Sequence, residues 1–322
     1  MDTRREKNDK NGTGGILAAI GVMLLFIAYL MGWVDIPDEV FLYPLDTSGG
    51  SSAVGNSESE SLPVSTEELK IHIIDVGQGD CVLIQAPAKT ILIDTGEEGY
   101  GPIVMGYLDN LGVDSIDVII ATHPHSDHIG DMDYVIKKLK KVGVVYMAET
   151  PESMIPTTRC YENLLNAIIE KNAVLKTASI GSSLKLSENG RLTFMGPVEP
   201  FEDYNNNSLV SRITFGNRAF LFGGDSSREA EELLLKTGKN ISCDYMHIAH
   251  HGSSSSTTQA YLDAVDPAYA TISCGEDNSY GHPNRSVIKS LEQKGVEYYR
   301  TDLHGNILVV SDGEKIKITT EK

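Results

Sequence analysis

Four potential metal ligands lie within six residues of the sequence, at His123, His125, Asp127 and His128. Neutral imidazole and carboxylate groups are good ligands for Zn²⁺ and related divalent ions. In an extended segment His123 and His125 project from the same side toward one ion, which leaves Asp127 and His128 for a second position. The alternative interpretation is a solvent-exposed histidine-rich loop. Because the group directly follows an apolar segment, residues 117–122, that predicts a buried strand, we favour a metal site.

Further polar residues follow or precede other apolar segments in the same way. Asp225 ends the run FLFGGD, where its carboxylate could bridge two cations. His250 and His251 end another strand-like segment. One of them would bind the second ion, and the other would lie next to that ligand without binding the ion. The polar cluster at residues 205–208 precedes a further strand. Each feature alone is equally well explained by a turn or a core histidine, but their occurrence together favours a two-metal site.

Several motifs together resemble the metallo-β-lactamase superfamily. They are the group at residues 123–128, DVGQGD at 75–80, IDTG at 93–96, NNNSLV at 205–210, FGGD at 222–225, HHGS at 250–253, YGHP at 280–283 and TDLHGNI at 301–307. Within that superfamily the chain is similar to the soluble hydrolase domain of the ComEC competence family. The resemblance extends from residue 70 to residue 318 and implies an αββα sandwich, a four-layer α/β fold with a dinuclear metal site at one edge.

The resemblance also implies a role for each matching residue. The implied ligands are His123 and His125 for the first ion, Asp127, His128 and His251 for the second, and Asp225 as the bridge. The implied outer residues, which support the ligands or contact substrate, are Asp80, Asp94, Asn207, Ser208, His250 and Tyr280. No histidine stands at the superfamily's usual third position for the first ion, and the region of Asn207 takes its place. This departure leaves both Zn²⁺ and Mn²⁺ open as the bound ions.

Two such ions would lower the pKa of a water between them and so supply hydroxide near neutral pH. Asp127 is a candidate to orient this hydroxide as a base, in addition to binding metal. His282 is a candidate general acid or oxyanion partner, the alternative being a histidine that only packs in its loop. Basic side chains beside His282 would indicate a phosphate substrate, and the candidates are Arg212, Arg285 and Arg300.

Three functional hypotheses follow from these residues. The first is a metal-dependent phosphodiesterase or nuclease, which the ComEC resemblance favours. The second is another hydrolase with the same site, namely an esterase, a lactonase or a β-lactamase. The third is a non-catalytic surface-binding protein, which the nearly complete ligand set disfavours. The substrate would be a small ester, a phosphodiester or the end of a nucleic acid, and no motif indicates a protein partner.

The composition is that of a globular chain with an uneven charge distribution. Of the 322 residues 41% are hydrophobic and 22% charged, which excludes a disordered, collagen-like or polytopic membrane chain. The formal charge is −18; residues 1–14 carry +1 and residues 35–69 carry −8, which leaves −11 for residues 70–322. Such acidity argues against a nucleic-acid coat protein, because neutralising phosphates requires clustered Lys and Arg.

Residues 15–34 form an apolar run without a charged side chain. Its 20 residues, at about 1.5 Å each, span the roughly 30 Å hydrocarbon core of a bilayer. We predict an uncleaved transmembrane signal anchor, in preference to a core helix or a cleaved signal peptide. Because Lys and Arg precede it, residues 1–14 would be cytoplasmic and the hydrolase domain, residues 70–322, extracytoplasmic. The acidic, Ser- and Gly-rich residues 35–69 would be a flexible linker.

Residues 70–322 alternate between strand and helix patterns. Strands are predicted within 69–77, 81–87, 90–96, 117–122, 142–149, 182–197, 208–225, 244–252, 268–275 and 306–320. Helices are predicted within 102–113, 133–141, 160–172, 227–238, 259–265 and 284–295, and residues 123–130 are predicted to be a loop. The hairpins are too many for a purely parallel sheet and the helices too many for a β-sandwich. Two mixed sheets with helices outside accommodate both.

Overall fold

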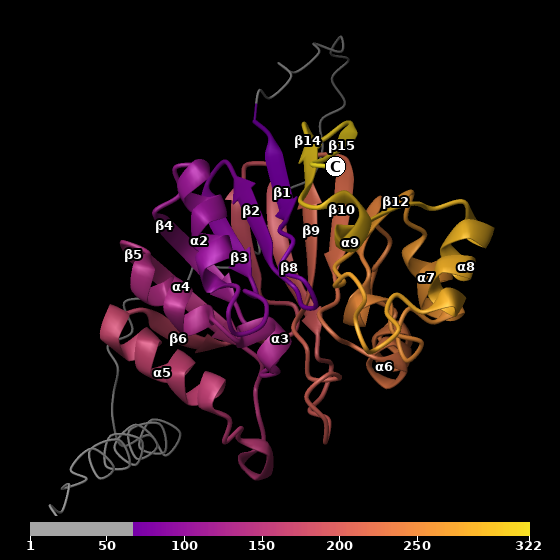
Figure 1. The fold of residues 1–322 in the computed structure, drawn as a ribbon. Coiled ribbons are helices and arrows are strands. Elements are labelled where there is room, and N and C mark those ends of the chain that lie inside the picture. The colour runs from indigo at the N-terminus through magenta and orange to yellow at the C-terminus, as the bar shows by residue number, and fades with distance from the viewer. Residues whose placement is uncertain (1–66) are drawn as a thin grey trace, which may run out of the picture. The chain divides into compact units, whose positions relative to one another are not determined.

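The structure, a computed structural model, describes residues 67–322 (Figure 1). The predicted anchor at residues 15–34 and nearly all of the predicted linker lie outside the described residues. Between residues 67 and 322, no helix has both the length and the apolar character that crossing a bilayer requires.

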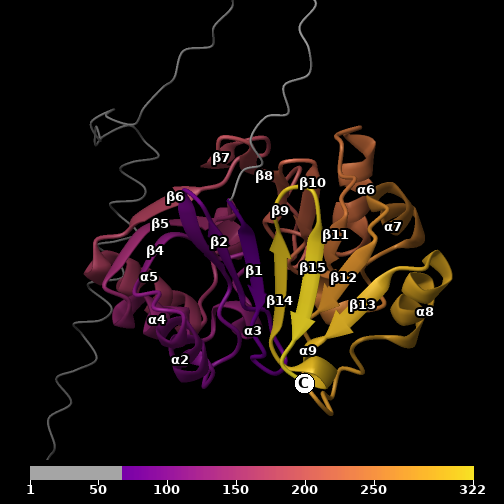
Figure 2. The same cartoon turned by 90° about the horizontal axis from the view of Figure 1, so that it is seen from above.

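Within this range a mixed sheet of eight strands has the order β15-β14-β1-β2-β3-β4-β5-β6. Its strands are β1 (Leu69–Ile73), β2 (Val82–Ala86), β3 (Lys89–Ile93), β4 (Ser115–Ile120), β5 (Lys141–Met147), β6 (Val174–Thr177), β14 (Ile307–Ser311) and β15 (Ile316–Thr320). Strands β3 to β6 run parallel, so their carboxyl ends share one edge. The C-terminal hairpin β14–β15 pairs with β1, and Figure 2 shows the three strands side by side.

A second mixed sheet, of seven strands in the described chain, has the order β13-β12-β11-β10-β9-β8-β7. Its strands are β7 (Ser183–Ser187), β8 (Gly190–Gly196), β9 (Val210–Phe215), β10 (Arg218–Phe222), β11 (Tyr245–His247), β12 (Tyr269–Ile272) and β13 (Glu297–Arg300). Strands β7 to β10 form an antiparallel meander, and β10 to β13 run parallel. The carboxyl ends of β10, β11 and β12 therefore also share one edge.

Helices cover the outer faces of the two sheets (Figures 1 and 2). Those on the first sheet are α2 (Gly101–Asn110), α4 (Met132–Lys138) and α5 (Arg159–Lys171); those on the second are α6 (Arg228–Lys236), α7 (Gln259–Val265) and α8 (Arg285–Lys294). Short helical turns lie in the connections, at α3 (Ser126–Ile129), η1 (Glu152–Met154), η2 (Ala249–Gly252) and α9 (Thr301–His304). Helix α5 illustrates the pattern, since Leu164, Ala167 and Ile168 recur at helical spacing and are buried.

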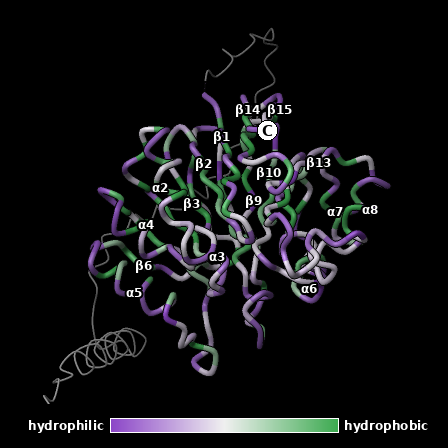
Figure 3. Tube along the Cα trace, viewed as in Figure 1, coloured by the Kyte–Doolittle hydropathy of each residue, from purple (hydrophilic) through white to green (hydrophobic). Residues whose placement is uncertain are grey.

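Three buried apolar clusters hold these four layers together. One lies between the sheets, where Ile71 and Ile84 of the first sheet meet Phe194 and Phe220 of the second. The other two lie between each sheet and its helices. Figure 3 accordingly shows hydrophobic residues gathered along the central strands. The predicted αββα arrangement of two mixed sheets with helices outside is confirmed.

The structure corrects the element predictions in several places. Strands β6 and β13 were not predicted, because each is a four-residue edge strand with little buried apolar surface. Residues 123–130 are not entirely a loop, since α3 begins at Ser126. The predicted strand at residues 244–252 ends at His247, because His250 and His251 take left-handed backbone conformations that a strand does not allow.

Candidate metal centre

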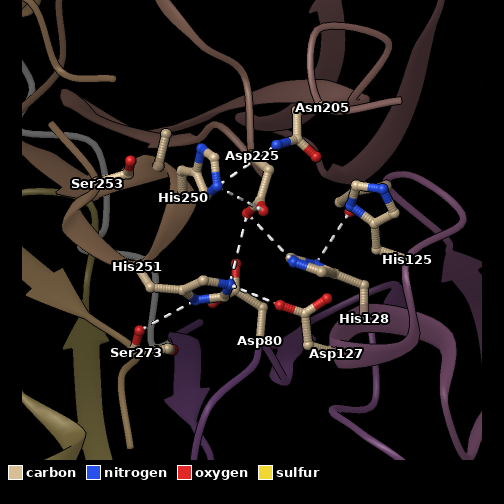
Figure 4. A network of polar contacts seen from close by, with 12 residues as sticks. Asp80, His125, Asp127, His128, Asn205, Asp225, His250, His251, Ser253 and Ser273 are labelled. Carbon is tan, nitrogen blue, oxygen red and sulfur yellow. Dashed lines mark hydrogen bonds and ion pairs between the residues drawn. The ribbon is translucent and has the colours of Figure 1, made fainter. Parts of the chain in front are cut away.

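Loops from the carboxyl ends of strands in both sheets meet at one edge of the sandwich. Residues 123–128 follow β4, Asp225 follows β10, and His250 and His251 lie in η2 after β11. Clefts outside the carboxyl ends of parallel strands are the usual place for functional residues in α/β folds. Figure 4 shows these side chains converging on Asp225.

Asp225 lies at the centre of the site with two imidazoles facing each carboxylate oxygen. Its Oδ1 is 3.1 Å from His128 Nε2 and 3.7 Å from His251 Nε2. Its Oδ2 is 3.7 Å from His123 Nε2 and 3.6 Å from His250 Nε2. A carboxylate placed in this way is suited to bridging two cations.

Two groups of potential ligand atoms share Asp225. The first group consists of His123, His125 and Asp225, and the second of Asp127, His128, Asp225 and His251. Within each group all ligand atoms lie within 4.8 Å of one another. In the first group His123 Nε2 is 3.0 Å from His125 Nδ1, and in the second His251 Nε2 is 3.3 Å from Asp127 Oδ2. The structure thus brings together the six predicted metal ligands.

Asp94 holds the ligand loop, residues 123–128, in place by hydrogen bonds to Thr122 and His128. It accepts a hydrogen bond of 2.7 Å from His128 Nδ1, and its two oxygens accept from the backbone and hydroxyl of Thr122. With Nδ1 committed to Asp94, His128 presents Nε2 to Asp225. Outer carboxylates commonly fix the orientation of a ligand imidazole in this way.

His251 has a support of its own, part of which the sequence did not reveal. Its Nδ1 lies 3.1 Å from the carbonyl oxygen of Ser273 and 3.4 Å from Asp80 Oδ1. Asp80 is buried and also lies 3.3 Å from His247 Nε2, while His247 Nδ1 meets Thr271 Oγ1 at 2.8 Å. His247 and Ser273 were missed because they occur singly in apolar strands, where the sequence indicates only core packing.

Of the two residues predicted in the segment at 205–208, Ser208 lies at the site and Asn207 does not. Ser208 Oγ accepts a hydrogen bond from the backbone N–H of Asp225, so it helps to place the bridging carboxylate. The amide of Asn207 bonds instead to the backbone of Phe201 and Asp203 and closes its own loop. Asn205 is the member that reaches the histidines, with Nδ2 3.4 Å from His250 Nε2.

His282 and Tyr280 lie at the solvent side of the site. The ring of His282 lies 5.7 Å from that of His250 and 6.2 Å from that of His251. Tyr280 is 69% exposed and stacks on His282 with an interplanar angle of 23°. Burial, followed by the charges of His251 and His250, lowers the pKa of His282, so its neutral form predominates at pH 7.

The charges of the site are strongly coupled in the metal-free protein. Burial alone would raise the pKa of Asp225, but the charges of His128 and His251 outweigh it and hold that pKa well below its usual range. Against the opposing effect of burial, Asp225 and Asp94 in turn raise the pKa of His128 well above its usual value. The pKa of His251 is raised to about 10, because Asp225, Asp127 and Asp80 outweigh its burial. By contrast burial, with the charge of His128, lowers the pKa of His123 well below normal.

Three buried atoms of the site are those that divalent ions would bind. His128 Nε2 and His251 Nε2 lie 3.1 and 3.7 Å from Asp225 Oδ1, yet none of the three atoms makes a hydrogen bond to a described residue. Buried polar atoms without a partner are rare in folded proteins. Imidazoles and carboxylates make up both ligand groups, a set that suits Zn²⁺ and Mn²⁺. The residues therefore fit two divalent ions on either side of Asp225.

We predict that metal binding releases protons from His128 and His251. Both pKa values are raised, so both side chains are positively charged imidazolium ions at pH 7 in the metal-free protein. A histidine that binds metal must be neutral, so each must lose one proton. Metal affinity should therefore rise as the pH is raised from 6 to 9. Calorimetric titration of Mn²⁺ in buffers of different ionisation enthalpy measures the protons released, and a heat that is the same in every buffer would contradict the prediction.

Comparison with known proteins agrees with this geometry. A family model described as "Metallo-beta-lactamase superfamily" matches residues 74–276. ComE operon protein 3 of Bacillus subtilis (strain 168) is 29% identical over 266 residues, 76% of this chain and 33% of that protein. Competence protein ComA of Neisseria gonorrhoeae is 29% identical over 245 residues, 75% of this chain and 32% of that protein. The predicted resemblance to the superfamily and to competence proteins is confirmed.

A more distant relative has a name that states an activity. Endoribonuclease ysh-1 of Neurospora crassa is 27% identical over 221 residues, 61% of this chain and 25% of that protein. The chain spans about a third of the length of the competence relatives that it matches. The family match, residues 74–276, contains the six predicted metal ligands.

Proposed function

Because the chain belongs to the metallo-β-lactamase superfamily, we propose that it is a metal-dependent hydrolase that cleaves phosphodiester bonds. The observation that carries the proposal is the carboxylate of Asp225, which has two imidazoles at each oxygen and unpaired ligand atoms around it. Two divalent ions bound there would activate a water and neutralise charge on phosphoryl oxygens. The similarity to a protein named as an endoribonuclease supports a phosphodiester as the substrate.

Asp127 is the residue proposed to orient the attacking water. Its side chain is 26% exposed, while its Oδ2 lies 3.3 Å from His251 Nε2. The nearby imidazoles of His251 and His128 outweigh the effect of burial and hold the pKa of Asp127 at about 2. Asp127 is therefore ionised at neutral pH and can accept a hydrogen bond from a water on its open side.

His282 is proposed to act on the leaving group. Its Nδ1 is buried and has no hydrogen-bond partner among the described residues, although the residue as a whole is half-buried at the site's edge. Its backbone is held by Asn278, which accepts from the N–H and donates to the carbonyl of His282. A neutral imidazole held in this way can donate one hydrogen bond to an oxygen that gains negative charge.

A substrate panel tests the proposed reaction with the full chain. The panel contains bis-p-nitrophenyl phosphate, a single-stranded oligonucleotide, a lactone and a cephalosporin, each assayed with Zn²⁺ and with Mn²⁺. The proposal expects hydrolysis of the two phosphodiesters. Cleavage of the lactone or the cephalosporin alone would replace it by the second candidate.

That second candidate is hydrolysis of a carboxylic ester, a lactone or a β-lactam at the same site, and the arginines favour it because such substrates carry no phosphate. Arg212 donates to the carbonyl oxygen of Ser242, and Arg300 pairs with Asp302. Of the three arginines proposed to bind phosphate, these two are thus engaged elsewhere. Arg285 is exposed at the start of α8, three residues after His282, and is the one of the three that remains a candidate to bind phosphate.

Tyr280 is predicted to stack on a base of a nucleic-acid substrate. An exposed aromatic ring beside a catalytic centre stabilises a bound base by about 1–3 kcal/mol, which corresponds to a 5- to 150-fold change in binding. Tyr280→Ala should therefore raise KM for an oligonucleotide by about that factor and leave KM for bis-p-nitrophenyl phosphate nearly unchanged. Tyr280→Phe, which keeps the ring, serves as the control. Equal changes for both substrates would argue against stacking.

The segment at residues 15–34 is proposed to tether the domain to a membrane, with residues 1–14 in the cytoplasm. The support is its 20-residue length without a charge, preceded by Lys and Arg. In fractionated cells the full chain should resist extraction by alkaline carbonate. Replacing Leu24 and Leu25 with Arg should release it, and release of the unaltered chain by carbonate would contradict the tether.

A further inference from the structure

Besides the bridging Asp225, the first ion has only two ligands in the predicted assignment, His123 and His125, and a third histidine ligand is missing because none stands at the position where the superfamily usually has one. We propose that His250 is that ligand, so that the neighbouring residues His250 and His251 each bind a different ion. The assignment rests on the dinuclear site of the proposed function but not on its substrate.

The position of His250 around Asp225 is the first argument. Its Nε2 faces Asp225 Oδ2, the oxygen that His123 Nε2 also faces, at 3.6 and 3.7 Å. His251 faces the other oxygen together with His128. His250 is therefore the imidazole that the structure adds to the side of Asp225 on which His123 lies, and Figure 4 shows both His250 and His251 directed at the carboxylate of Asp225.

The hydrogen bond at the other ring nitrogen of His250 is the second argument. Its Nδ1 lies 3.2 Å from Ser255 Oγ, just as His128 Nδ1 is held by Asp94 and His251 Nδ1 by the carbonyl of Ser273. A hydrogen-bond partner at Nδ1 fixes the ring and turns Nε2 toward Asp225, as outer partners of metal-binding histidines do. His250 therefore shares with the two predicted ligands a partner at Nδ1 and an Nε2 that faces Asp225.

The backbone supplies the third argument. His250 has φ 55° and ψ 42°, and His251 has φ 53° and ψ 22°. Left-handed conformations of residues other than glycine are costly and cluster at functional sites. Hydrogen bonds from His250 N to Gly224 O and from Ser253 N to His250 O hold this turn. The turn sets the two rings 6.3 Å apart at 78°, and their Nε2 atoms face different oxygens of Asp225.

The side chain of Asn205 lies beside the same nitrogen. Its Nδ2 is 3.4 Å from His250 Nε2, and its Oδ1 is buried without a hydrogen-bond partner among the described residues. Oxygen and imidazole ligands together suit Mn²⁺ as well as Zn²⁺. The side of the site occupied by His250 is also the more open one, since His250 is 20% exposed and His251 1%. The first ion should therefore exchange more readily than the second.

Metal titration of the full-length metal-free chain tests the assignment. The unaltered chain should bind two Mn²⁺ ions. His250→Ala should still bind the second ion, but its affinity for the first should fall by more than about 100-fold. That loss exceeds the one expected when a residue that only hydrogen-bonds to a ligand is removed. Ser255→Ala, which removes only the partner at Nδ1, should lower the affinity for the first ion by about 10- to 100-fold. His251→Ala should show the mirror image, with the second ion lost and the first retained.

A second variant separates metal binding from folding. His250→Gly relieves the left-handed backbone, so the chain should fold, and free imidazole added to the solution should restore binding of the first ion. Two ions bound with unaltered affinity in His250→Ala, or no effect of imidazole on His250→Gly, would overturn the assignment. An unaltered chain that binds two ions but cleaves no phosphodiester would contradict the proposed function and leave the assignment intact.

Discussion

Replacing Asp225 with asparagine is expected to remove both ions and to lower kcat/KM for a phosphodiester by at least about 1,000-fold, roughly 4 kcal/mol of transition-state stabilisation. Each carboxylate oxygen faces two histidines, so the amide removes the bridging charge from both ions at once. The amide has the same shape, and the backbone N–H of residue 225 still donates to Ser208 Oγ, so the fold should persist. Metal analysis, circular dichroism and the rate of hydrolysis together measure the result.

Asp312→Asn is the matched control, because Asp312 is an exposed turn residue that accepts bonds only from its own loop. It should keep both ions and full activity.

The double variant His125→Ala with Asp225→Ala should, like Asp225→Asn, lose metal uptake and hydrolysis without unfolding. Full turnover by that double variant, in a sample shown to lack metal, would remove Asp225 and His125 from the site.

Gly79→Ala is expected to lower the free energy of unfolding by about 2–6 kcal/mol and to weaken metal binding. Gly79 has φ 147°, which side chains rarely allow, and a Cβ there would lie 2.3 Å from the carbonyl oxygen of Asp127. Strained backbone costs about 1–3 kcal/mol, and overpacking costs about as much again. Since Asp80 N donates to the same carbonyl, the contact would displace the ligand loop and Asp80 together. Denaturant unfolding and metal titration measure the two effects.

Gly112→Ala separates the two causes. Gly112 also has a positive φ, of 69°, but a Cβ there would meet no atom within 4 Å. It should therefore show only the cost of the backbone conformation and no change in metal binding. If Gly79→Ala destabilises the chain no more than Gly112→Ala and binds metal normally, the close approach to Asp127 has no role.

Much of the site could be predicted from the sequence because its residues follow apolar strands. Asp225 ends one such run, and the group from His123 to His128 ends another, so parallel strands bring them to one edge of the fold. The resemblance added the order of the motifs and with it the αββα arrangement. The core elements were predictable for the same reason, since their apolar periodicity is strong.

What could not be predicted depends on side-chain direction and on unusual backbone conformations. The pattern HHG did not indicate that His250 and His251 point to different oxygens of Asp225, because that depends on a left-handed turn. Nor did the sequence distinguish Asn205 from Asn207, since both lie in the same polar segment. The contact of Asp80 with His247 joins residues 167 positions apart and has no local signature.

Metal content and hydrolysis, measured on the same preparation of the full chain, test the central claim most directly. The chain is stripped with a chelator and then titrated with Mn²⁺ or Zn²⁺ while cleavage of an oligonucleotide is followed. We predict two ions per chain, no cleavage by the stripped protein, and a rate that rises until the second ion is bound. Undiminished cleavage by protein that holds no metal, or no cleavage of any phosphodiester with both ions bound, would contradict the claim.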